Sequence, residues 1–224
     1  YSIKNKSRVG DNKFSDISVF SFHPVKSITT GEGGMVTTSN KLLYQKMISI
    51  KNHGIQRKNS NKKKYYWSYI VTSHGYNYRL SDINCALGYS QIKRLNKFII
   101  KRNKIAILYN ELLKKNIDVI HTPKKFKDTY SAWHLYIINI NFKKLRIKKE
   151  KLIKLLFEKY IITQVHYIPT YLQPVFRDLK KNYLNGSKKY FEASLSLPIY
   201  YELSIKNVKY IAKTLNQILE KYKN

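Results

Sequence analysis

The chain has 224 residues, of which 43% are hydrophobic, enough for one or two globular domains with a sizeable core. Its formal net charge of +30 raises the alternative of a polyanion-binding protein, but the lysines are scattered and no nucleic-acid-binding motif appears, so we expect no nucleic-acid partner. No apolar stretch approaches the roughly 20 residues of a membrane span, and the single cysteine, Cys85, has no partner for an internal disulfide. We therefore expect a cytoplasmic protein without a membrane partner.

The first part of the chain predicts two strands and a helix. Residues 17–22 and 35–38 are apolar runs bounded by turn signals, a pattern typical of buried strands. The glycine-rich segment 31–34 predicts a turn before the second strand. Asn40 is expected to cap a helix, because its side chain can accept hydrogen bonds from the first free amide groups. The polar and basic residues 52–64 predict a surface loop.

A long helix is predicted from Ser81, a capping residue, to Leu112. It exceeds an average globular helix, so we expect a break or kink within residues 95–98. Such a helix suits a bridge between two domains, which we place at residues 1–115 and 116–224. The second is predicted to be a small α/β domain, because strands are mixed with helices. Its predicted elements are a strand at 133–140, a helix at 148–160, a short strand at 164–167, a helix or turn at 191–196 and a terminal helix at 205–222.

Lys26 lies between the two strands that are predicted to be buried. Burial disfavours the charged ammonium and so favours the neutral amine. A neutral amine can attack an aldehyde and hold it as a Schiff base. The alternative is a solvated surface lysine beside a hairpin turn, and spacing alone favours this alternative.

Three segments resemble the DegT/DnrJ/EryC1/StrS family of sugar aminotransferases, and the resemblance runs in order over essentially the whole chain. They are SFHPVKSITTGEGG at residues 21–34, GYNYRLSDINCALG at 75–88 and QVHYIP at 164–169. The resemblance implies an α/β protein of the pyridoxal-phosphate-dependent transferase fold type I. Residues 1–115 then correspond to the C-terminal part of the large cofactor-binding domain with its bridging helix. Lys26 occupies the position of the lysine that carries the cofactor, pyridoxal 5'-phosphate.

The same resemblance implies roles for four further residues. It assigns Ser21 to the cofactor phosphate, and Asn77 to the phosphate in a partner subunit, which implies a homodimer with shared active sites. It assigns His166 and Tyr167 to the sugar nucleotide. Arg57 lies in the basic loop after His53 and Gly54, and we expect it to bind the diphosphate of the substrate. On the residues alone, an ordinary structural interpretation stays open for Ser21, Asn77 and His166: a serine satisfied by backbone, an asparagine in a turn, and a core or surface histidine.

The implied reaction transfers an amino group from glutamate to C4 of a UDP-linked 4-keto-6-deoxy-N-acetylhexosamine, in the biosynthesis of pseudaminic acid or another surface glycan. Two alternatives stay open: an aminotransferase for another nucleotide-activated 4-keto sugar, and a truncated paralogue without catalytic activity. The family's acidic partner of the pyridine nitrogen falls before Tyr1. We therefore expect a fragment of a longer protein that does not bind the cofactor productively alone. The histidines are isolated, so no metal site is predicted.

Overall fold

The computed structural model describes residues 6–56, 67–176 and 184–224. The chain forms two compact units. Unit 1 comprises Tyr1–Leu95 with Asp128–Tyr130, and unit 2 comprises Asn96–Lys127 with Ser131–Asn224. The units divide within one helix, and the domain division predicted at residues 115 and 116 stays a prediction.

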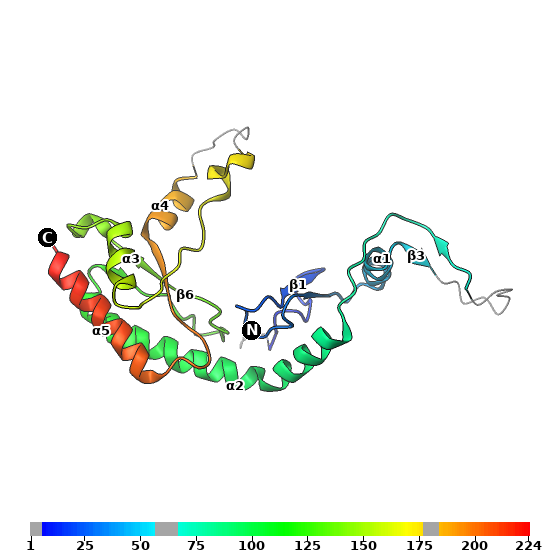
Figure 1. Ribbon diagram of the computed structural model, residues 1–224, viewed down its shortest axis with the longest axis horizontal. Helices are drawn as coiled ribbons and strands as arrows, with labels where there is room; N and C mark the ends of the chain where they lie inside the picture. Colours follow the sequence, from blue (N-terminus) through cyan, green and yellow to red (C-terminus); the bar gives the residue numbers. More distant parts are fainter. Residues whose placement is uncertain (1–5, 57–66, 177–183) are drawn as a thin grey trace. The chain divides into compact units, whose positions relative to one another are not determined.

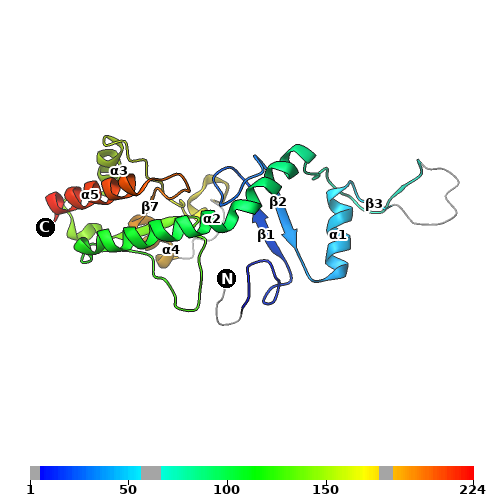
Figure 2. The same cartoon turned by 90° about the horizontal axis from the view of Figure 1, so that it is seen from below.

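That helix, α2, runs without interruption from Asp82 to Leu112 (Figures 1 and 2). The break predicted near residues 95–98 is therefore wrong, whereas the alternative of a kink there stays a prediction. No glycine or proline occurs between residues 89 and 112 to interrupt the hydrogen-bond ladder. The predicted cap is confirmed, because Ser81 Oγ accepts a 3.3 Å hydrogen bond from the amide of Asn84.

Unit 1 contains a two-stranded antiparallel sheet, in which β1 (Ser18–Ser21) pairs with β2 (Gly34–Thr37). Both predicted strands are confirmed, but the prediction that they are buried is wrong. No residue of either strand is fully buried, because no other strand pairs with them among the described residues. Unit 1 also contains α1 (Lys41–Lys51), β3 (Ile55–Gln56) and β4 (Ile70–Val71).

The start of α1 is fixed by Asn40, as predicted. Its Oδ1 accepts hydrogen bonds from the amides of Leu42 at 2.9 Å and Leu43 at 3.2 Å. These contacts satisfy two of the amides that the first turn of a helix leaves unpaired.

Unit 2 is built on a three-stranded antiparallel sheet with the order β5 (Ile120–His121), β6 (Tyr136–Ile140), β7 (Ser194–Leu197). All apolar side chains that are fully buried in the described residues belong to this unit. The remaining elements are η1 (Leu113–Asn116), η2 (Phe142–Lys144), α3 (Lys149–Phe157), η3 (Thr170–Leu172), η4 (Pro174–Phe176), α4 (Asn185–Ala193) and α5 (Ile205–Tyr222).

Of the elements predicted for unit 2, one has the predicted bounds and three differ from the prediction. Helix α5 has the predicted bounds, whereas strand β6 begins three residues later than predicted, after Trp133 with its φ of +49°. The predicted strand at 164–167 is reduced to a single bridge between Gln164 and Ser196. The helix or turn predicted at 191–196 is partly wrong, because Ser194 begins β7.

Arg102, on α2, connects separate segments of unit 2. Its Nη1 donates hydrogen bonds to the carbonyl oxygens of Trp133 at 3.0 Å, His134 at 3.3 Å and Ile199 at 2.9 Å. Burial lowers the pKa of Arg102. One guanidinium thus ties α2 to the segment before β6 and to the segment after β7.

Within the described ranges, none of the helices combines the length and the apolar character that crossing a membrane requires.

Candidate functional site

Lys26 lies on the loop that connects β1 to β2. The base of this loop is closed by two backbone hydrogen bonds, from Phe22 N to the oxygen of Gly33 at 2.9 Å and from Thr30 N to the oxygen of Phe22 at 3.0 Å. The amide of Lys26 donates to the oxygen of His23 at 2.9 Å and forms a turn. Lys26 is half-buried. The loop therefore holds the lysine on an ordered backbone.

The first turns of α2 hold the far end of this loop. The side-chain amide of Asn84 donates a hydrogen bond to the carbonyl oxygen of Thr30. Gly88 allows close approach, because a Cβ there would lie 2.7 Å from Thr30 Cγ2. Gly33 has a φ of +147°, and a Cβ there would lie 2.9 Å from Leu80 Cδ1. Two of the segments on which the family resemblance rests, 21–34 and 75–88, thus contact each other.

Ser21 is the last residue of β1 and enters the same loop. It is exposed, and its Oγ accepts a 3.5 Å hydrogen bond from the amide of His23. The hydroxyl hydrogen is therefore available to an acceptor such as a phosphate oxygen. The His23 ring faces Glu32, with 3.8 Å between Nε2 and Oε1, and the Glu32 side chain is 79% exposed.

Asn77 lies in an extended segment that pairs with the end of α1. The Asn77 backbone bridges to Asn52, and the flanking rings of Tyr76 and Tyr78 stack with centroids 4.8 Å apart. Asn77 is exposed. Among the described residues, no hydrogen bond joins Asn77 to Ser21 or Lys26.

His166 and Tyr167 lie in unit 2, next to β7. His166 Nδ1 is 2.7 Å from Ser196 Oγ, and the His166 ring meets the Tyr167 ring edge-on at 4.7 Å between centroids. Arg57, the remaining predicted residue, lies outside the described residues.

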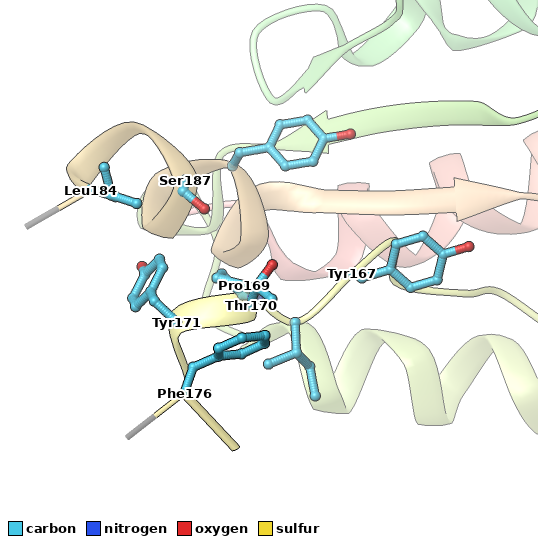
Figure 3. A pocket seen from close by; sticks show the side chains of 9 residues that line it. Tyr167, Pro169, Thr170, Tyr171, Phe176, Leu184 and Ser187 are labelled. Carbon is cyan, nitrogen blue, oxygen red and sulfur yellow. The ribbon is translucent and has the colours of Figure 1, made fainter. Parts of the chain in front are cut away.

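Tyr167 lines a pocket of about 440 Å³ (Figure 3). The pocket lies between the segment that carries η3 and η4 and the helix α4, and Tyr171, Phe176 and Tyr190 contribute three further aromatic rings. Thr170 and Ser187 supply hydroxyl groups, and none of the described residues that line the pocket is charged. Sequence reasoning missed Phe176 and Tyr190. The aromatic residues that follow the third matched segment were the available signal.

The residues around Lys26 fit part of a pyridoxal-phosphate site. The Lys26 amine suits the cofactor's aldehyde, and the Ser21 hydroxyl suits its phosphate. Glu32, the acidic residue of this loop, is turned toward His23 and exposed, which does not suit a buried partner for a pyridine nitrogen. Among the described residues, no group of three histidine, cysteine or acidic side chains suits a metal ion.

The fold matches that of known sugar aminotransferases. An aminotransferase of pseudoaminic acid biosynthesis from Helicobacter pylori superposes with a TM-score of 0.84 at 33% identity, over 93% of this chain and 54% of that chain. The PLP form of a putative sugar aminotransferase from Streptococcus pneumoniae superposes with a TM-score of 0.82 at 28% identity, over 94% of this chain and 53% of that chain. The chain therefore has the fold type I architecture of the pyridoxal-phosphate-dependent transferases.

The family itself follows from the sequence match. Residues 2–216 match the DegT/DnrJ/EryC1/StrS aminotransferase family, whose members depend on pyridoxal phosphate, and the chain belongs to that family. The UDP-4-amino-4,6-dideoxy-N-acetyl-beta-L-altrosamine transaminase of Campylobacter jejuni is 40% identical over 213 residues, which are 94% of this chain and 54% of that protein. The chain spans about half the length of the curated relatives it matches.

Proposed function

We propose that the protein to which this chain belongs is a cytoplasmic, pyridoxal-phosphate-dependent aminotransferase. It moves an amino group from glutamate to C4 of a UDP-linked 4-keto-6-deoxy-N-acetylhexosamine, in pseudaminic acid biosynthesis. The observation that carries this proposal is the 40% identity to the Campylobacter jejuni transaminase over 94% of the chain. The ordered loop that carries Lys26 supports it.

In this proposal, Lys26 and Ser21 act on the cofactor from one loop. The bound cofactor supplies an electron sink for charge that develops on the substrate carbon. Lys26 Nζ would hold the cofactor through its aldehyde, and the amine, when free, would take up and return a proton. Ser21 Oγ donates a hydrogen bond to the phosphate. Asn77 is exposed, and among the described residues no hydrogen bond joins it to this loop, which agrees with a role in the site of a partner subunit and hence with a homodimer.

The sugar nucleotide is assigned to the segment that carries His166 and Tyr167. Among the described residues, the lining of the pocket beside Tyr167 is rich in aromatic rings and includes no charged side chain. Such a lining suits an uncharged planar base, because aromatic rings stack on the face of a base. The diphosphate needs cationic groups instead, and this role is assigned to Arg57.

The test is a transamination assay on the longest polypeptide that carries this chain in its natural reading frame. It is incubated with pyridoxal phosphate, glutamate and either a UDP-linked or a GDP-linked 4-keto-6-deoxy sugar, and products are identified by mass spectrometry. We expect an amino sugar and 2-oxoglutarate with the UDP-linked substrate. Faster amination of the GDP-linked sugar would favour the alternative substrate, and no product with either would favour a paralogue without activity.

A further inference from the structure

Ser196, on β7, contacts the ring of His166, the residue that the proposed function assigns to the sugar nucleotide. The Oγ of Ser196 lies 2.7 Å from Nδ1 of His166, although the two residues are 30 positions apart in the sequence. Ser196 is 5% exposed, whereas His166 is half-buried. The serine is thus the interior partner of this contact, and the histidine is the partner that keeps surface in contact with solvent.

The backbone on both sides of Ser196 fixes the position of its hydroxyl group. On one side, Ser196 is paired with Ile137 of β6. On the other side, the amide of Ser196 donates to the Gln164 carbonyl oxygen at 2.8 Å, and the amide of Gln164 donates to the Ser196 carbonyl oxygen at 3.2 Å. Because Gln164 precedes His166 by two residues, this bridge holds the segment that carries the histidine alongside β7.

The direction of the hydrogen bond decides which ring nitrogen of His166 carries the hydrogen. A neutral imidazole donates at one nitrogen and accepts at the other, and the hydrogen bond at one nitrogen sets the role of the second. If Nδ1 donated to Ser196, the buried hydroxyl would need another acceptor, and no hydrogen bond to one occurs among the described residues. A buried donor without an acceptor is costly. The contact therefore favours a ring that accepts at Nδ1 and carries its hydrogen at Nε2.

We propose that Ser196 is a positioning residue of the sugar-nucleotide site: it holds the His166 ring so that Nε2 donates a hydrogen bond to an oxygen of the UDP group. The inference rests on the proposed function, which assigns His166 to the sugar nucleotide. The Tyr167 ring meets the His166 ring edge-on, with 4.7 Å between centroids, and this contact restricts rotation of the imidazole as well. Both the phosphates and the base of UDP offer acceptor oxygens to such a donor.

The first measurement needs neither cofactor nor substrate. The longest polypeptide that carries this chain in its natural reading frame is labelled with nitrogen-15 in histidine, and the His166 ring signals are assigned by their loss in His166→Gln. We expect the signal of an acceptor at Nδ1 and the signal of a protonated nitrogen at Nε2. In Ser196→Ala, we expect averaged signals from exchange between the two tautomers. A protonated Nδ1 in the unchanged protein, or unchanged signals in Ser196→Ala, overturns the proposal.

Ser194 provides a matched control on the same strand. It is 1% exposed, and within the part of the chain that the structure describes, its Oγ has no hydrogen-bond partner. Ser194→Ala and Ser196→Ala each remove one buried hydroxyl from β7, but only Ser196→Ala removes the donor to His166. We expect Ser194→Ala to keep the ring signals of the unchanged protein. Equal changes in the two variants would show a general loosening of β7 and would overturn the positioning role.

The second measurement connects the ring to the nucleotide. In calorimetric titrations, Ser196→Ala is expected to bind UDP roughly fivefold more weakly, which corresponds to one lost hydrogen bond, and Ser194→Ala should bind it like the unchanged protein. Titration with uridine distinguishes the two acceptors. A loss seen with UDP but not with uridine assigns the hydrogen bond to a phosphate, and an equal loss with uridine assigns it to the nucleoside.

The two measurements separate failure of this inference from failure of the proposed function. If Ser196→Ala changes the ring signals of His166 but leaves the UDP affinity unaltered, the role of Nε2 in binding the nucleotide is overturned. If the unchanged protein binds no UDP, the proposed function fails and the role of Nε2 fails with it. The ring signals still show in that case whether Ser196 sets the tautomer of His166.

Discussion

The side-chain amide of Asn84 donates a hydrogen bond to the carbonyl oxygen of Thr30, although the two residues are 54 positions apart in the sequence. Asn84 belongs to the first turn of α2, and Thr30 belongs to the loop that carries Lys26. The bond joins the helix to the loop within unit 1. It explains why two segments with separate resemblances to the family act as one structural element.

Removing the donor at residue 84 should loosen the loop. Asn84→Asp keeps the shape of the side chain but loses the amide hydrogens that bind the Thr30 oxygen. A lost hydrogen bond of about 1 kcal/mol corresponds to roughly fivefold faster local opening. We expect amide exchange of residues 30–33 to accelerate by about this factor, measured by hydrogen–deuterium exchange. Unchanged exchange would mean that Gly33 and Gly88 packing alone holds the loop.

Replacing Lys26 should abolish both cofactor attachment and turnover. Borohydride reduction of the loaded protein, followed by peptide mass spectrometry, is expected to find the cofactor on the peptide that contains Lys26. Lys26→Ala should leave that peptide unmodified and the protein inactive. The control is Lys46→Ala, at an exposed position of α1, which should behave like the unchanged protein. Full activity of Lys26→Ala would refute the mechanism.

The aromatic pocket should bind the base of the nucleotide without electrostatic help. Phe176→Ala and Tyr190→Ala are each expected to weaken UDP binding by about 1–3 kcal/mol, the usual worth of stacking on one base. Because each substitution removes an uncharged ring, the loss should be equal at low and high salt in calorimetric titrations. Phe157→Ala, at the exposed end of α3, serves as the control. If both pocket variants bind UDP with unaltered affinity, the base binds at another place.

The two units should respond differently to the loss of apolar side chains. Leu152 is fully buried in α3, and Leu152→Ala is expected to cost about 2–5 kcal/mol of unfolding free energy in a urea titration. Val19→Ala, in exposed β1, should change that free energy by no more than about 0.5 kcal/mol. A similar loss of unfolding free energy in both variants would show that Val19 is buried in the folded protein.

Acid should remove one contact at the C-terminal end of the chain. Lys223 Nζ donates a 3.1 Å hydrogen bond to Asp118 Oδ1, which holds the pKa of the Asp118 carboxyl below its ordinary value. A carboxyl with a lower pKa in the folded state stabilises the fold above its unfolded pKa, and this stabilisation is lost as the pH falls through the folded pKa. Asp118→Asn should therefore flatten the decline of the urea midpoint between about pH 5 and pH 2. Superimposable pH profiles for the two proteins would show that the contact is without effect.

Local signals were enough to predict the capped helices. Asn40 and Ser81 accept the hydrogen bonds expected of capping residues, and α5 has the predicted bounds because its apolar residues repeat at the helical period. Strand β7 was missed because four residues are too few to show a period. Its buried serines, Ser194 and Ser196, do not look like core residues in the sequence.

The residues of the candidate site also differ in whether a local sequence signal predicts them. Lys26 lies in a continuous segment that resembles the family, and its assignment from that resemblance stays a prediction. The pocket depends on Phe176 and Tyr190, which come from separate elements, so no spacing predicts their meeting. Burial of β1 and β2 was predicted wrongly. The apolar side chains of a strand show that it can be buried, but they do not show whether another segment packs against it.

Arg102 has a consequence for how the chain can be divided. Its guanidinium is the shared donor for three carbonyl oxygens, at Trp133, His134 and Ile199. A polypeptide that begins at Asn96 retains this donor, whereas one that begins after Arg102 removes it from all three carbonyl oxygens, of which those of Trp133 and Ile199 are in buried contacts. The minimal autonomous fragment of the C-terminal half therefore has to start inside α2, upstream of residue 102.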